Sequence, residues 1–188
     1  MRFATLRTVF VQHNSFQITI DEAIELIGHL QIGLENSQLW ADLGCGSGLF
    51  SRALATRLPK QSKILCIDKE RSLRTGETNN VMLEFIKADF SRYEFEDGQF
   101  NGVMMANSLH YIKNQSALIN RLTSALKPNG KMVIVEYDTD SSNFWVPYPV
   151  SFDMLKTLLR GLNINKIAKI GERPSRFGRM MYCCEVNP

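Results

Sequence analysis

The chain has 188 residues, 44% of them hydrophobic and 22% charged, which suits one globular domain with a sizeable core. We expect no membrane partner, because no apolar run approaches the roughly 20 residues that cross a bilayer, and no signal peptide, because the first residues lack a long apolar region. The formal net charge of +3 is small and does not by itself indicate a strongly acidic or basic partner.

The first 37 residues are predicted to form an arm followed by a helix. Residues 1–17 show no clean periodicity, although Phe10 and its apolar neighbours could pack as a helix or an arm. The segment Thr19-Ile20-Asp21-Glu22 matches a capping box, and apolar residues at helical spacing predict a helix from about Ile20 to Leu30.

A glycine-rich loop follows the first predicted strand, Leu39–Leu43. It alternates glycines with two small residues, in the order Gly44, Cys45, Gly46, Ser47 and Gly48. A helical pattern begins at Leu49 and ends before Pro59. The loop and the helix N-terminus would offer backbone N–H groups to a polar or anionic ligand. The spacing fits neither a P-loop nor a dinucleotide fingerprint, because Leu49 stands where the third glycine of GxGxxG would be.

The second predicted strand, Lys63–Ile67, is almost continuously apolar, as expected for a strand buried on both faces. It ends in Asp68, whose carboxylate could accept hydrogen bonds from both hydroxyls of a ribose. NAD-dependent enzymes also bind the ribose through an acidic residue at this position. Asp68 therefore indicates a ligand that contains adenosine but does not identify that ligand. The segment Glu70–Asn80 contains Gly76 and a polar cluster, which permit about two turns of helix.

The remaining predicted elements continue the alternation of strands and helices. They are the strand Val81–Ala88, the strand Phe100–Ala106, a helix from Asn114 to Lys127, a turn at Leu126–Gly130, the strand Lys131–Glu136, a helix from Phe152 to Gly161, and strands at Asn165–Ile170 and Met180–Val186. This alternation indicates a parallel, doubly wound sheet.

The segment Asn143–Val150 is rich in aromatic residues and proline, and it leaves the carboxyl end of a central strand. Open α/β sheets bind their ligands at that edge, so Trp145 and Tyr148 could form stiff walls of a substrate pocket. A hydrophobic plug or a lid over the sheet is the alternative interpretation.

The cysteines and histidines indicate neither a disulfide framework nor a metal site. The four cysteines are Cys45, Cys66 and the adjacent pair Cys183 and Cys184, and the three histidines lie far apart in the sequence. We therefore expect no metal and a reducing, cytoplasmic location.

Two signatures resemble the class I S-adenosylmethionine (SAM) dependent methyltransferases of the small-molecule, methyltransferase-domain type. The first is Asp42-x-Gly44-x-Gly46-x-Gly48, and the second is the helix that ends in the turn Leu126-Lys127-Pro128-Asn129-Gly130 with the strand that follows. The resemblance is strong over Leu39–Asp138. It implies a Rossmann-like α/β fold, a three-layer α/β/α sandwich with a seven-stranded, mostly parallel sheet and an antiparallel last strand.

The resemblance also implies one methyltransferase domain over residues 1–188. Its parts would be an N-terminal arm and helix (residues 1–37), a cofactor-binding core (38–138), and an acceptor-side loop, helix and last two strands (139–188).

The resemblance assigns cofactor contacts to loops that follow the predicted strands. They are Asp42, Gly44, Cys45, Gly46, Ser47, Asp68, Lys69, Asp89, Phe90, Asn107, Ser108 and Leu109. Candidates for the acceptor pocket are Phe10, Tyr111, Trp145 and Tyr148. No catalytic base is assigned, although His110 and Tyr111 are the candidates, because an imidazole with an ordinary pKa near 6.5 can act as one.

The implied reaction is transfer of the methyl group of SAM to an O, N or C nucleophile, with release of S-adenosylhomocysteine, and a small molecule is the expected acceptor. The alternatives are a non-catalytic SAM- or nucleotide-binding module, an RNA methyltransferase and an NAD-dependent oxidoreductase. The glycine spacing argues against the oxidoreductase. Residues 151–188 carry seven Lys and Arg against three Asp and Glu, so nucleic acid is a possible but not a favoured partner. The sequence does not indicate the oligomeric state.

Overall fold

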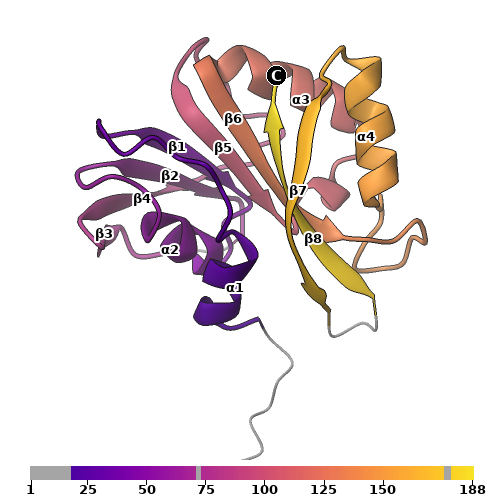
Figure 1. Ribbon diagram of the computed structural model, residues 1–188, viewed down its shortest axis with the longest axis horizontal. Helices are drawn as coiled ribbons and strands as arrows, with labels where there is room; N and C mark the ends of the chain where they lie inside the picture. The colour runs from indigo at the N-terminus through magenta and orange to yellow at the C-terminus, as the bar shows by residue number, and fades with distance from the viewer. Residues whose placement is uncertain (1–17, 71–72, 176–178) are drawn as a thin grey trace, which may run out of the picture.

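The computed structural model describes residues 18–70, 73–175 and 179–188, which form a twisted sheet with helices on both faces (Figure 1). Eight strands of the described residues form one sheet in the order β3-β4-β2-β1-β5-β6-β8-β7. The strands are β1 (Leu39–Leu43), β2 (Lys63–Asp68), β3 (Gly76–Thr78), β4 (Val81–Lys87), β5 (Phe100–Ala106), β6 (Leu126–Tyr137), β7 (Lys166–Pro174) and β8 (Met180–Asn187).

The strand directions confirm the predicted α/β class. The central strands β4, β2, β1, β5 and β6 run parallel, whereas β8 is antiparallel to both β6 and β7 at one edge of the sheet. The predicted count of seven strands is wrong by one, because β3 adds a short antiparallel strand at the other edge.

The strand β3 lies where the sequence predicts about two turns of helix, and that prediction is wrong. Gly76 pairs with Leu83 and Thr78 pairs with Val81, so β3 and β4 form a hairpin. Asn79 and Asn80 connect them with φ angles of 53° and 59°. Positive φ at both central residues defines a tight hairpin turn whose twist suits the two strands, and asparagine tolerates this conformation better than most residues.

The strand β6 begins at Leu126 rather than at Lys131, which corrects a second boundary. Leu126 pairs with Phe100, and the register then shifts before Lys131 pairs with Gly102. Asn129 keeps a turn-like φ of 63° inside this irregular start. The sequence predicts the turn at Leu126–Gly130 correctly. It does not predict that the chain pairs with β5 both before this turn, at Leu126, and after it, at Lys131.

Helices cover both faces of the sheet. The helices are α1 (Ile20–Leu26), α2 (Leu49–Ala55), the 3-10 helix η1 (Leu109–Tyr111), α3 (Gln115–Ala125) and α4 (Phe152–Gly161). One core lies between the sheet and the adjacent helices α1 and α2, and a second lies between the sheet and α3 and α4 (Figure 1). Trp40 fills the first core and packs flat over Gly102, where an added Cβ would lie 2.4 Å from the ring.

Because the central strands are parallel, the loops that follow β1, β2, β4, β5 and β6 all leave the sheet at the same edge. Open α/β sheets bind ligands there. No helix in the described ranges is both long enough and apolar enough to cross a membrane.

Candidate functional site

The loop between β1 and α2 places glycine backbone, without side chains, at the carboxyl edge of the sheet. Gly44 and Gly46 have φ angles of 77° and 54°, a left-handed conformation that favours glycine. A Cβ on Gly44 would lie 2.6 Å from the Cβ of Ser108 and 3.3 Å from the ring of Phe90. Glycine at position 44 therefore lets the chain pass close to the loops after β4 and β5.

The carboxylate of Asp68 joins two of the loops at the carboxyl edge. Its Oδ2 accepts a hydrogen bond from the backbone N–H of Gly46 at 2.9 Å, and its Oδ1 accepts one from the N–H of Glu70 at 2.8 Å. Charge-assisted hydrogen bonds of this kind fix the orientation of a side chain. Asp68 is thus held at the tip of β2 beside the glycine loop.

These loops enclose a pocket of about 490 Å³. Eight of the twelve cofactor contacts that the resemblance assigns line it, together with Glu70, Ser91, Tyr111 and Ile112; the eight are Gly44, Gly46, Asp68, Lys69, Asp89, Phe90, Asn107 and Ser108. The structure therefore gathers residues that are up to 64 positions apart in sequence around one space of ligand size, from Gly44 to Ser108.

One wall of the pocket consists of Asp89 and Phe90, directly after β4. The Oδ1 of Asp89 accepts hydrogen bonds from the hydroxyl and the backbone N–H of Ser91, at 2.6 and 2.9 Å. The hydroxyl of Ser91 contributes most to a lowered pKa of Asp89, so this carboxyl is ionised at neutral pH. The wall thus combines a flat ring with a negatively charged acceptor.

Asn107 contributes an unused hydrogen-bond acceptor to the opposite wall. Its backbone has a φ of 53°, and its N–H donates to the carbonyl of Val135 at 2.8 Å. Its side-chain Oδ1 is buried and has no hydrogen-bond partner in residues 18–70, 73–175 and 179–188. A buried acceptor is costly to leave unpaired, so this atom is suited to a ligand that donates an N–H.

Four of the assigned cofactor contacts do not line the pocket. Asp42 is buried behind the glycine loop, where the hydroxyl of Ser51 donates to its Oδ2 at 2.5 Å. Burial raises the pKa of Asp42 to about 7, and the charge of Asp68 adds to the increase. Cys45, Ser47 and Leu109 also lie outside the lining, and their role as direct contacts stays a prediction.

The two candidates for a catalytic base occupy different environments. Tyr111 lines the pocket and is 54% exposed. His110 is buried and does not line it, because its imidazole Nδ1 lies 2.6 Å from the Oε2 of Glu136. Sequence reasoning missed Glu136, although a charged residue at the end of an apolar strand is a signal that could have identified it.

The acceptor-pocket candidates are also separated. Phe10 lies outside the described residues. Trp145 lines a second pocket, of about 280 Å³, near the end of β6. Tyr148 lines neither this pocket nor the first one, and its backbone N–H donates to the carbonyl of His110 at 3.0 Å.

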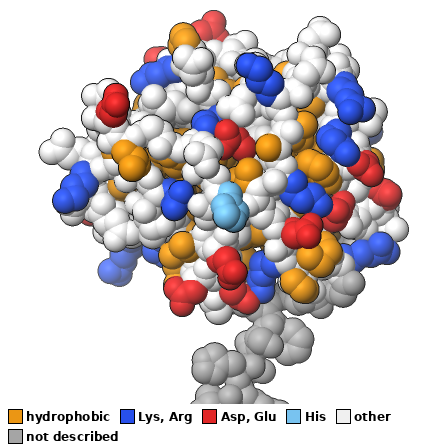
Figure 2. All heavy atoms as spheres, viewed as in Figure 1, with side chains coloured by type: hydrophobic (Ala, Val, Ile, Leu, Met, Phe, Trp, Pro, Cys, Tyr) orange, Lys and Arg blue, Asp and Glu red, His pale blue; other side chains and the backbone are white. Residues whose placement is uncertain are grey.

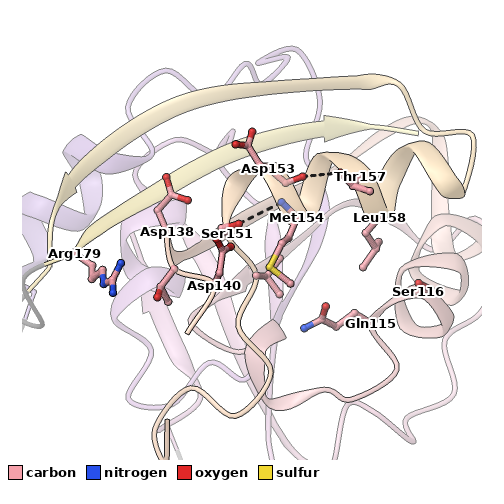
Figure 3. A pocket seen from close by; sticks show the side chains of 12 residues that line it. Gln115, Ser116, Asp138, Asp140, Ser151, Asp153, Met154, Thr157, Leu158 and Arg179 are labelled. Atoms are coloured by element: carbon pink, nitrogen blue, oxygen red, sulfur yellow. Dashed lines mark hydrogen bonds between the residues drawn. The ribbon is translucent and has the colours of Figure 1, made fainter. Parts of the chain in front are cut away.

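A third pocket, of about 690 Å³, lies between the end of β6 and the start of α4 (Figure 3). Asp138, Asp140 and Arg179 contribute side chains to it, and Arg179 lines the second pocket as well. The Oδ1 of Asp138 accepts a hydrogen bond from the backbone N–H of Phe152 at 2.9 Å. Sequence reasoning did not single out Arg179, whose place between these pockets depends on the β7–β8 hairpin.

Comparison with known proteins agrees with the motifs. A family model described as a methyltransferase domain matches residues 41–130. An uncharacterized methyltransferase of Mycobacterium tuberculosis is 29% identical over 108 residues, which cover 56% of this chain and 53% of the relative. A trans-aconitate 2-methyltransferase of Paracidovorax citrulli is 33% identical over 95 residues, which cover 50% and 36%. The chain thus spans about half the length, or less, of these curated relatives.

Solved structures share the fold at low sequence identity. A SAM-dependent methyltransferase from Archaeoglobus fulgidus matches with a TM-score of 0.69 and 15% identity, over 92% of this chain and 96% of that one. A Burkholderia thailandensis 1,6-didemethyltoxoflavin-N1-methyltransferase matches with a TM-score of 0.60 and 16% identity, over 89% and 77%. Together these matches support the resemblance: residues 41–130 match the methyltransferase-domain model, and the chain shares its fold with a SAM-dependent methyltransferase.

Proposed function

We propose that this chain is a SAM-dependent methyltransferase that transfers a methyl group to an O, N or C nucleophile of a small molecule and releases S-adenosylhomocysteine. The observation that carries the proposal is the pocket of about 490 Å³, in which a glycine backbone, three carboxylates and two aromatic rings come together. The matched Burkholderia structure contains S-adenosylhomocysteine and the small molecule 1,6-didemethyltoxoflavin, which supports the same ligand classes here.

The residues of the pocket fit SAM part by part. Asp68, at the tip of β2, would accept hydrogen bonds from the ribose hydroxyls, while Phe90 would pack on the adenine ring and Asp89 would accept from its amino group. The unpaired Oδ1 of Asn107 would accept from the amino group of the methionine part. Because Gly44 has no side chain, the loops that carry Phe90 and Ser108 can pack against the glycine loop and shape this pocket.

SAM supplies the activated methyl group through its sulfonium. The protein's part is to align the nucleophile with that methyl group and to keep water out of the site. Tyr111 is the candidate general base that lines the pocket, whereas the burial of His110 favours a positioning role for that residue. A nucleophile that is already ionised at neutral pH, such as a carboxylate, needs no base from the protein.

The chain's other expected properties are part of the same proposal. A cofactor-binding core at residues 38–138 agrees with the extent of the pocket lining, and residues 139–188 would serve the acceptor side. Acidic and basic side chains are interspersed on the face in Figure 2, which favours a small acceptor over nucleic acid. Four free, buried cysteines favour a reducing, cytoplasmic location.

Methyl transfer is tested with SAM that carries a labelled methyl group. The purified protein is incubated with panels of small carboxylic acids, phenols, amines and phosphate esters, and labelled products are separated by chromatography. Incorporation into one panel, abolished by excess S-adenosylhomocysteine, is the expected result. Tight binding of SAM without transfer to any panel would instead indicate a non-catalytic SAM-binding module.

A further inference from the structure

We infer that the pocket of about 280 Å³ near the end of β6 binds the acidic group of the methyl acceptor, and that the acceptor is therefore a small carboxylate or phosphate compound held by Arg179. This inference rests on the proposed function and specifies its substrate class. Three features of the described residues carry it: the charge of the lining, the free guanidinium of Arg179, and the position of the pocket relative to the cofactor site.

The lining of this pocket combines apolar walls with groups that can bind an anion. Among the described residues, eight line it: Tyr137, Thr139, Ser141, Ser142, Asn143, Trp145, Val146 and Arg179. Arg179 is the only charged residue among the eight, so no carboxylate of the described lining competes with an anionic ligand. Hydroxyl and amide groups accompany it, which are common partners of carboxylate and phosphate oxygens.

The guanidinium of Arg179 is available for a ligand. Its backbone carbonyl accepts a hydrogen bond from the N–H of Ser175 at 2.7 Å, and Arg179 lies directly before β8. Its side chain makes no ion pair and donates no hydrogen bond within the part of the chain that the structure describes. A planar guanidinium binds carboxylate and phosphate oxygens with two parallel hydrogen bonds, so a free one beside a pocket suits an anionic group.

The larger neighbouring pocket, which Arg179 also lines, has three acids among its described lining residues: Asp138, Asp140 and Asp153. Asp138 lies there with one oxygen bound to the N–H of Phe152, and its other oxygen is 3.8 Å from the ammonium of Lys169, which offsets its charge. Asp140 lines the same larger pocket and forms no ion pair with Arg179 (Figure 3). None of these carboxylates lines the smaller pocket, so Arg179 meets no acid among the described residues of that lining.

The smaller pocket lies beside the cofactor pocket along the sheet edge. The ring of His110 is 4.3 Å from that of Tyr111, which lines the cofactor pocket, and 6.0 Å from that of Tyr137, which lines the smaller one. An acceptor anchored at Arg179 would thus extend past these rings with its other end toward the methyl group. A volume near the lower limit of about 300 Å³ for ligand pockets suits a metabolite rather than a polymer.

Tryptophan fluorescence can report binding at this pocket directly. The chain has two tryptophans. Trp40 is 1% exposed and donates to Gln38, whereas Trp145 is 63% exposed and lines the pocket. Benzoate, phenyl phosphate and neutral benzyl alcohol are titrated into the protein with and without S-adenosylhomocysteine, and Trp145→Phe identifies the responding ring.

The inference predicts that at least one of the two anions binds and that benzyl alcohol does not. Arg179→Gln should weaken the anion at least tenfold, since hydrogen bonds to charged groups carry that much affinity. Arg160 is an exposed residue of α4 that lines none of the three pockets, so Arg160→Gln removes the same charge and should leave the affinity unchanged. A preference for benzoate or for phenyl phosphate distinguishes a carboxylate acceptor from a phosphate one.

Three results would overturn the inference: no binding of either anion, equal binding of benzyl alcohol, or equal affinity in Arg179→Gln and wild type. Binding of S-adenosylhomocysteine is measured in parallel. If it binds while the anions do not, the acceptor class is wrong and the proposed function stands. If it fails to bind while the anions still require Arg179, the anion site stands and the proposed function fails.

Discussion

His110 and Glu136 form a buried pair that joins η1, which follows β5, to the end of β6. The Nδ1 of His110 lies 2.6 Å from the Oε2 of Glu136, and the backbone N–H of His110 donates to the Oε1 at 3.1 Å. The side chains are 2% and 1% exposed. The carbonyl of His110 in turn accepts the N–H of Tyr148. One residue thus ties the cofactor side of the site to the aromatic loop.

Glu136→Ala should destabilise the protein by roughly 3 kcal/mol, because it leaves two donors of His110 unpaired in the interior. Glu136→Gln keeps an acceptor oxygen of similar size and should lose less. Urea denaturation of both variants and of wild type measures the free energy of unfolding. An alanine variant as stable as wild type would show that the pair does not hold the two strand ends together.

Asp42 should make the stability depend on pH. Its pKa is about 7 in the folded chain and about 3.9 when unfolded, so the folded state binds the extra proton between these values. The stabilisation is complete below about pH 4 and is lost as the pH rises through about 7, by up to about 1.4 kcal/mol per pH unit. Urea denaturation across this range should show a smaller loss for Asp42→Asn than for wild type.

The comparison between Asp42→Asn and wild type isolates this carboxyl, since both proteins share every other titrating group. Identical pH profiles would mean that Asp42 has an ordinary pKa in the folded protein. The amide variant also tests the cofactor role assigned to Asp42. Because the residue lies behind the loop, we expect only a small change in affinity for S-adenosylhomocysteine.

Gly44→Ala should abolish cofactor binding. The added Cβ would meet the Cβ of Ser108 at 2.6 Å, and the φ of 77° would be strained for alanine. Gly98→Ala is a matched control, because Gly98 has a φ of 64° but no atom within 4 Å of the added Cβ. The control should cost only about 1–2 kcal/mol of strain and leave the affinity for S-adenosylhomocysteine unchanged. Equal effects of the two substitutions would contradict the proposed close contact.

The sequence predicted the central strands well because their burial on both faces produces continuous apolar runs. The strand β5 has the predicted bounds, Phe100–Ala106. The helix α4 also has its predicted bounds, Phe152–Gly161. It did not predict β3, because a three-residue strand has no periodicity and depends on the turn at Asn79 and Asn80. Positive φ at two adjacent asparagines is a property of the folded chain that composition alone does not reveal.

For the candidate site, the sequence located the loops but not the direction of their side chains. Asp68 and Asp89 line the pocket, whereas Asp42 and His110 turn into the interior. A motif fixes where a residue lies along a strand, but the partners that draw it inward, such as Glu136, are distant in the sequence. Arg179 was missed because its place beside the pockets depends on the pairing of β7 with β8 and not on a local motif.

The central claim is that the pocket beside Asp68 binds SAM, and calorimetric titration tests it most directly. Wild type should bind SAM and S-adenosylhomocysteine in the micromolar range and should not bind NAD. Asp68→Ala should weaken both at least tenfold, because the charged acceptor is lost together with its bonds to Gly46 and Glu70. Asp97→Ala, in an exposed turn outside the pocket, should bind like wild type. Unchanged SAM affinity in Asp68→Ala, or binding of NAD instead of SAM, would contradict the account.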